Sequence, residues 1–149
     1  MSTSFSTSSA RNVFYGGTAF FVLLFAALVF QSESETPKRD RREMLAANPQ
    51  IAAGKRIWED NNCIGCHSLL GEGAYFAPEL GNVVDRFGGG EEGKAAVKAF
   101  IQSRPPEGIS GRRSMPQFNL GEKQLNEIAD FLEYASKIDT AKWPPNIQG

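Results

Sequence analysis

The chain has 149 residues, of which 16 are lysine or arginine and 17 are aspartate or glutamate. This length predicts one domain, or one domain with an appendage, and the near-zero net charge excludes a strongly basic nucleic-acid binder. Two cysteines and one histidine are too few for a structural zinc site or a disulfide scaffold. All three lie in one pentapeptide, Cys63-Ile64-Gly65-Cys66-His67, which therefore decides the chemistry of the chain.

The N-terminal region is expected to hold a membrane anchor. Residues 1–12 are rich in serine and threonine and are expected to be disordered. Val13 to Phe30 is free of charge, and as a helix this run is about 27 Å long, close to the hydrocarbon thickness of a bilayer. A cleaved signal peptide is the alternative, but its apolar core is shorter and it ends in an Ala-x-Ala-like pattern, absent here. We therefore expect an uncleaved transmembrane helix over residues 13–31.

The segment after the anchor is strongly charged. Residues 32–47 carry Pro37 and show no apolar periodicity, so they are expected to be a charged linker or a helical extension of the anchor. One basic residue, Arg11, precedes the apolar run. Four closely follow it: Lys38, Arg39, Arg41 and Arg42. By the positive-inside rule this count alone places the larger C-terminal part in the cytoplasm.

Residues 48–149 are predicted to form one small, all-α, loop-rich domain. An Asn-Pro pair at 48–49 is typical of a helix start and predicts a helix over residues 50–60. Amphipathic spacing predicts two more helices, over 93–103 and 122–137. The stretches between these helices are rich in glycine and proline, and none of them alternates as a strand does.

A glycine-rich run, Gly88–Lys94, matches the G-x-x-x-x-G-K part of a phosphate-binding loop. The next residue is Ala95, so the hydroxyl that would hold Mg²⁺ is missing. Two glutamates inside the run would also repel phosphate. We interpret the run as a flexible surface loop before a helix.

The pentapeptide has the Cys-x-x-Cys-His form that attaches a c-type haem. Two cysteines at this spacing can each form a thioether with one porphyrin vinyl group, and the following histidine then lies at the iron. A thioredoxin-like dithiol and half of a zinc site are the alternatives, but the chain shows neither a βαβ pattern nor further zinc ligands. We expect Cys63 and Cys66 to bind haem c covalently and His67 to ligate its iron.

Met115 is the candidate for the second axial ligand, because it is the one methionine after the pentapeptide. It lies between Ser114 and Pro116 in a polar loop, whereas most methionines fill apolar cores. A His–Met pair is typical of electron-transfer cytochromes. With His67 and Met115 both on the iron, no position is left for a substrate, so the sequence predicts an electron carrier.

The remaining candidates surround the haem. A ligating histidine needs an acceptor for its other ring nitrogen, and the Pro78 carbonyl is a candidate acceptor for the His67 Nδ1–H. Large apolar side chains near the motif are candidates for the crevice wall, with ordinary core packing as the alternative. They are Trp58, Leu69, Leu70, Tyr75, Phe76, Leu80 and Phe118.

Taken in order, the helix, attachment motif, proline loop, methionine loop and final helix over residues 48–137 resemble the monohaem cytochrome c fold. A closer resemblance lies in the run from Cys63 to Leu80, which contains Gly-Glu-Gly-Ala-Tyr at 71–75. With the N-terminal anchor and the Trp-Pro-Pro tail at 143–145, this run is similar to the small cytochrome c subunit of bacterial nitric oxide reductases.

This resemblance implies a single-pass protein of the inner membrane with its haem domain in the periplasm, since a whole domain can translocate despite the Lys/Arg count. It implies that single electrons come from a soluble cytochrome c or cupredoxin. They would pass to haem b of a large catalytic subunit that reduces NO to N₂O. Cys63, Cys66, His67 and Met115 match the family's haem-binding positions. Tyr75 matches a position at the subunit interface whose backbone carbonyl contacts a structural calcium ion.

Other functions stay open at this point. One is a free membrane-tethered cytochrome c shuttle, or a subunit of another haem-copper-type respiratory complex. Another is a self-contained haem enzyme or gas sensor with an open iron position. The free shuttle would purify with haem c alone, and the haem enzyme or gas sensor would bind CO without any change to Met115.

Overall fold

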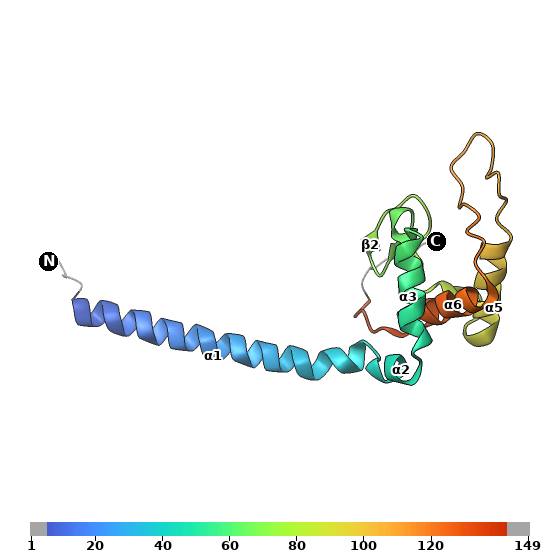
Figure 1. The fold of residues 1–149 in the computed structure, drawn as a ribbon. Coiled ribbons are helices and arrows are strands. Elements are labelled where there is room, and N and C mark those ends of the chain that lie inside the picture. Colours follow the sequence, from blue (N-terminus) through green and yellow to red (C-terminus); the bar gives the residue numbers. More distant parts are fainter. Residues whose placement is uncertain (1–5, 143–149) are drawn as a thin grey trace. The chain divides into compact units, whose positions relative to one another are not determined.

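The computed structural model describes residues 6–142 and is mostly helical (Figure 1). It divides into two units, with the boundary after Lys38. In chain order the elements are α1 (Thr7–Arg39), α2 (Arg42–Ala47), α3 (Gln50–Asp60), the short 3₁₀ helix η1 (Cys63–Gly65), β1 (Ser68–Leu69), β2 (Glu72–Gly73), α4 (Val83–Arg86), α5 (Gly90–Gln102) and α6 (Glu122–Lys137). The predicted all-α class is confirmed, because the two strands have two residues each.

Helix α1 begins earlier than the sequence predicts. The Ser6 hydroxyl accepts a hydrogen bond from the Ser9 N–H at 3.2 Å, and the Ser6 carbonyl accepts one from the Ala10 N–H. A serine in this position caps a helix, because it satisfies an N–H group that has no partner in the first turn. Residues 7–12, expected to be disordered, are therefore helical, while residues 1–5 lie outside the described part.

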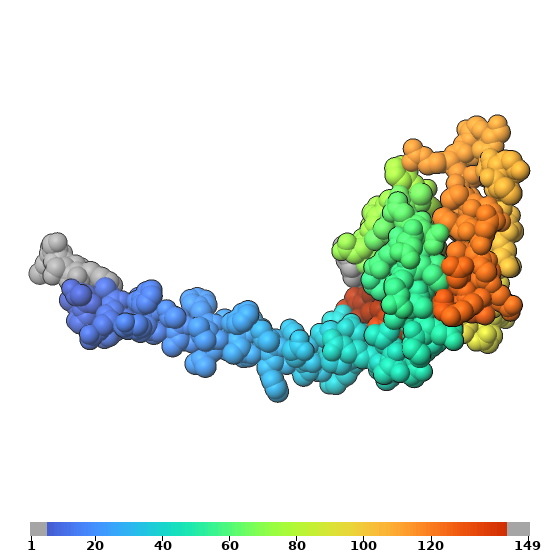
Figure 2. All heavy atoms as spheres, viewed as in Figure 1, coloured from blue at the N-terminus to red at the C-terminus, as the bar shows by residue number. Residues whose placement is uncertain are grey.

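Helix α1 is long and apolar enough to cross a membrane. None of its residues is buried within the chain, and large apolar side chains such as Leu23, Phe25 and Phe30 are more than half exposed (Figure 2, blue). An isolated helix with such a surface is stable in lipid, where its backbone hydrogen bonds are satisfied internally. The helix thus has the properties of a membrane-spanning segment.

The charged segment 32–47 is helical in two pieces. Helix α1 continues through it to Arg39, two residues after Pro37. Because Arg41 has a left-handed backbone with φ of 54°, the chain turns before α2 begins. Of the two expected alternatives, helical extension describes the first half of the segment.

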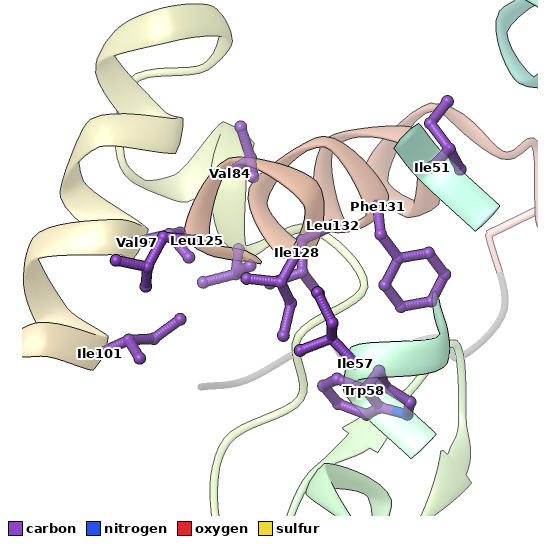
Figure 3. Packing of buried hydrophobic residues seen from close by; sticks show 11 residues of the cluster. Ile51, Ile57, Trp58, Val84, Val97, Ile101, Leu125, Ile128, Phe131 and Leu132 are labelled. Atoms are coloured by element: carbon purple, nitrogen blue, oxygen red, sulfur yellow. The ribbon is translucent and has the colours of Figure 1, made fainter. Parts of the chain in front are cut away.

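The core of the second unit is built on α3 and α6, which pack directly against each other (Figure 3). Both helices start and end at the predicted residues, α3 as expected from the Asn-Pro pair before it and α6 as expected from its apolar spacing. Each buried aliphatic or aromatic side chain of this core contributes about 1.5–3 kcal/mol to folding. The cluster comprises Ile51, Ile57, Trp58, Val83, Val84, Val97, Ile101, Leu125, Ile128, Phe131 and Leu132.

Helices α4 and α5 differ from the sequence expectations. The four-residue α4 is too short to give an apolar period, and α5 starts at Gly90, inside the run interpreted as a loop. Gly93, in the first turn of α5, allows this helix to approach α4 closely. A side chain there would overlap the Val84 carbonyl, so glycine lets the two helices approach and the gained packing outweighs its low helix propensity.

An ion cluster joins α5 to α6 and to the segment between α2 and α3. Lys94 of α5 lies 3.1 Å from Asp130 and 3.3 Å from Glu133, both on α6, and 2.6 Å from Glu91. Asp130 also accepts a hydrogen bond from the Asn48 side chain, just before α3. Burial lowers the pKa of Lys94, but these carboxylates outweigh it and hold the pKa above its usual range.

We expect Lys94→Met to lower the free energy of unfolding by about 1–3 kcal/mol, because it leaves partly buried carboxylates without their cation. The raised pKa means that the stabilisation is complete below the ordinary value of 10.5 and is lost as the pH rises further. Chemical denaturation between pH 6 and 11 checks both statements. Lys55→Met, which removes an exposed pair with Glu59, should cost less than about 1 kcal/mol.

Candidate haem site

The pentapeptide forms a tight turn directly after α3. Asn62 has a left-handed backbone with φ of 50°, which asparagine tolerates better than most residues. The N–H groups of Cys66 and His67 both bond to the Cys63 carbonyl, at 3.1 and 2.9 Å. The three chemistry-bearing side chains are thus presented from one short helical turn.

The following loop folds back over this turn. Ala74 N–H bonds to the Ile64 carbonyl and Ala77 N–H to the Cys66 carbonyl. Gly73 permits this return, because its φ is +114° and a Cβ there would lie 2.5 Å from the His67 carbonyl oxygen. The Gly-Glu-Gly-Ala-Tyr run is therefore a local requirement of the attachment turn.

The loop brings the Pro78 carbonyl to His67. Nδ1 of His67 lies 2.8 Å from this oxygen, and since a carbonyl can only accept, Nδ1–H is the donor. This hydrogen bond leaves Nε2 as the unprotonated nitrogen that can bind a metal. The imidazole ring is also near Trp58, with 6.4 Å between the ring centroids.

A cavity of about 370 Å³ opens beside these residues, in the size range of cofactor sites. Its walls come from the attachment turn, the proline loop, α4, α5, the methionine loop and α6. Figure 2 shows two of these segments, green and orange, with a cleft between them. The lining residues are Trp58, Cys63, His67, Pro78, Leu80, Val83, Arg86, Phe87, Val97, Phe100, Ile101, Met115 and Leu132.

Met115 lines the same cavity as His67, although 48 residues separate them in the sequence. Its loop, drawn in orange in Figure 1, is fixed to the end of α5 by the Gln117 amide, which donates to the carbonyls of Gln102 and Arg104. The structure thus brings together the histidine and the methionine named as axial ligands.

The two cysteines have different surroundings. Cys63 is half-buried and lines the cavity, whereas Cys66 is exposed and is not part of the wall. Burial raises the pKa of the Cys63 thiol to about 11, so that this thiol stays neutral at physiological pH.

Arg86 is a site residue that the sequence analysis did not find. Among the described residues lining the cavity, it carries the one permanent charge. Its Nη2 donates to the Glu79 carbonyl at 2.6 Å, which directs the guanidinium along the cavity rim. Its position on the very short α4 explains why no periodic pattern drew attention to it.

Several predicted wall residues lie elsewhere. Trp58 and Leu80 line the cavity as expected, but Tyr75 and Phe76 are 77% and 69% exposed. The other predicted wall residues outside the lining are Leu69, Leu70 and Phe118. The Tyr75 hydroxyl donates to the Gly71 carbonyl. The Trp-Pro-Pro tail at 143–145, which contributed to the family resemblance, lies outside the described residues.

These side chains fit a covalently attached haem. The cavity has apolar walls and is lined by the His67 imidazole, with Nε2 free to bind, by the Met115 thioether and by the Cys63 thiol. The Cys66 thiol lies in the same attachment turn as Cys63. Fold and site together define a cytochrome c domain, and the Cytochrome c family model matches residues 51–136.

Relatives that align over the full length show which kind of cytochrome c this chain resembles. The chain is 52% identical to the nitric oxide reductase C subunit of Stutzerimonas stutzeri, 46% to that of Paracoccus denitrificans and 45% to that of Halomonas halodenitrificans. Each alignment covers the whole of both chains. The chain belongs to the family of nitric oxide reductase C subunits and is an electron-transfer cytochrome subunit.

Proposed function

We propose that this chain delivers single electrons to the haem b of a large catalytic membrane subunit that reduces NO to N₂O. The observation that carries the proposal is the pairing of His67 and Met115 on one apolar cavity. With two protein ligands on a haem iron, no coordination position would be left open. The site is therefore suited to transferring electrons and unsuited to binding a gas.

Each residue of the site has a distinct task. Cys63 and Cys66 would hold haem c through thioether bonds, and His67 and Met115 would bind its iron. The bound haem supplies a reversible one-electron Fe(III)/Fe(II) couple. Pro78 orients the imidazole, and Arg86 is placed to neutralise a haem carboxylate at the cavity rim.

The apolar walls favour fast, reversible transfer. Buried residues such as Val97, Ile101 and Leu132 keep water away from the site, which reduces solvent reorganisation when the charge changes. A His–Met pair in such surroundings raises the reduction potential. A soluble periplasmic cytochrome c or cupredoxin is the donor that we propose.

We also propose the location and a second cofactor. Residues 13–31 would anchor the chain in the inner membrane, with residues 48–149 in the periplasm, where soluble donors are found. The length and apolar surface of α1 support the anchor. The exposed loop at Tyr75 would meet the large subunit, with the Tyr75 backbone carbonyl contacting a calcium ion there.

Purification from native membranes through a tag on this chain tests the proposal. We expect haem b to copurify with haem c, at more than one haem b per haem c in the pyridine haemochrome assay, together with NO consumption. Cross-linking before detergent is added separates a dissociated complex from a free shuttle. Haem c alone after cross-linking would show that the chain is a tethered shuttle. A mock purification of the untagged chain is the control.

A further inference from the structure

Glu79 is a buried carboxylate next to Pro78, and the proposed function does not use it. The residue is 5% exposed. Its Oε1 accepts two backbone hydrogen bonds, from Leu70 N–H at 2.7 Å and from Gly81 N–H at 2.8 Å. One oxygen atom thus joins the two ends of the loop that carries Pro78.

Backbone hydrogen bonds also hold this loop near the imidazole, and one of them runs from Ala77 N–H to the Cys66 carbonyl at 2.9 Å. The carbonyl of Ser68, directly after His67, accepts a hydrogen bond from Leu80 N–H at 2.9 Å. Glu79 adds the two hydrogen bonds that its side-chain Oε1 accepts, and its backbone carbonyl accepts a hydrogen bond from the Arg86 guanidinium. Pro78 lies between the Ala77 bond on one side and the Glu79 bonds on the other, so the distance from its carbonyl to Nδ1 depends on both.

Stability alone does not explain a carboxylate here. Oε2 of Glu79 is buried and has no hydrogen-bond partner among the described residues. Leaving such an atom unpaired opposes folding, and an uncharged acceptor would be cheaper to bury. The space is also closely fitted, because a Cβ on Gly81 would lie 2.6 Å from Oε1.

We propose that Glu79 is a positioning residue for His67, and this rests on the proposed haem ligation. By holding both ends of the loop, its Oε1 keeps the Pro78 carbonyl at hydrogen-bond distance from Nδ1–H. That bond sets the orientation and basicity of the imidazole, and with them the reduction potential of the iron. The reach of Oε1, rather than the negative charge, is the property that matters.

Two substitutions separate reach from charge in the full-length holoprotein in detergent. Glu79→Asp keeps the charge but withdraws the oxygens by one methylene, while Glu79→Gln keeps Oε1 in place and removes the charge. Glu72→Gln, an exposed carboxylate in the same loop, is the control. The readouts are the reduction potential and the exchange rate of the His67 Nδ1 proton, measured by NMR on the reduced protein.

We expect Glu79→Asp to raise the potential and to accelerate Nδ1–H exchange more than about tenfold, because the shorter side chain no longer reaches both backbone N–H groups. Exchange in Glu79→Gln and Glu72→Gln should stay within about twofold of the unsubstituted protein. Unchanged exchange in Glu79→Asp, or a larger change in Glu79→Gln, would overturn the proposal. An unsubstituted protein without a low-spin His–Met spectrum would instead contradict the proposed ligation.

Discussion

Gly54→Ala is expected to unfold the haem domain or to lower its stability by more than about 3 kcal/mol. A Cβ at this position would overlap the Glu127 carbonyl of α6 and lie 2.7 Å from Cβ of Phe131. Because the Cβ would overlap backbone atoms of α6, which cannot rotate away as a side chain can, the two helices must separate to relieve the overlap. Separation would open the core on both sides of the crossing.

Helix propensity predicts the opposite result, because alanine favours a helix over glycine by about 1 kcal/mol. Whether Gly54→Ala lowers or raises the free energy of unfolding therefore shows which effect is larger, the steric overlap or the helix propensity. Thermal unfolding of the holoprotein, followed by circular dichroism at 222 nm, measures it. Ala52→Gly, on the exposed side of the same helix, should cost only about 1 kcal/mol. A more stable Gly54→Ala protein would show that α3 and α6 do not approach as described.

Met115→Ala is expected to turn an inert haem into one that binds CO in the reduced state. Alanine has no ligand atom, so the iron position that we propose for Met115 would become free. The Gln117 bonds to Gln102 and Arg104 hold the loop from outside the cavity, so the fold should survive the change. We also expect the potential to fall, because a thioether ligand favours the reduced iron.

Optical spectra of the reduced protein with and without CO make the measurement. Met44→Ala is the matched control, since Met44 lies on α2 and is not part of the cavity wall. If the unsubstituted protein already binds CO, or if Met115→Ala stays inert, Met115 is not the ligand. CO binding by the unsubstituted protein would return the gas-sensor alternative, whereas an inert Met115→Ala protein would mean that another residue ligates the iron.

Sequence patterns predicted most of the fold correctly where one helix face repeats over several turns. Helices α3 and α6 have three or more apolar turns each, and their bounds agree with the predictions. The start of α5 was wrong because the residues before Gly93 belong to a glycine-rich run, whose low helix propensity favours a loop. The start of α1 depends on a single serine cap, which is hard to distinguish in a serine-rich segment.

The site was predictable where a covalent rule links neighbouring residues. Cys63, Cys66 and His67 were proposed from their spacing, and Pro78 from the need of a ligating histidine for an acceptor. Met115 was proposed because it is the one methionine after the pentapeptide. Arg86 could not be foreseen in this way, since its importance comes from which cavity it lines. Tyr75 and Phe76 were wrong as wall residues because aromatic character alone does not tell buried from exposed.

The close crossing of α3 and α6 also has a consequence for biosynthesis. These are the first and last helices of the haem domain, so the ribosome completes one long before the other. Their contact cannot form until nearly the whole domain has been made, and long-range contacts of this kind form late. Until then the attachment turn, directly after α3, has no finished core above it. Both thiols of the turn thus lie outside a finished core until α6 has been made and has packed against α3.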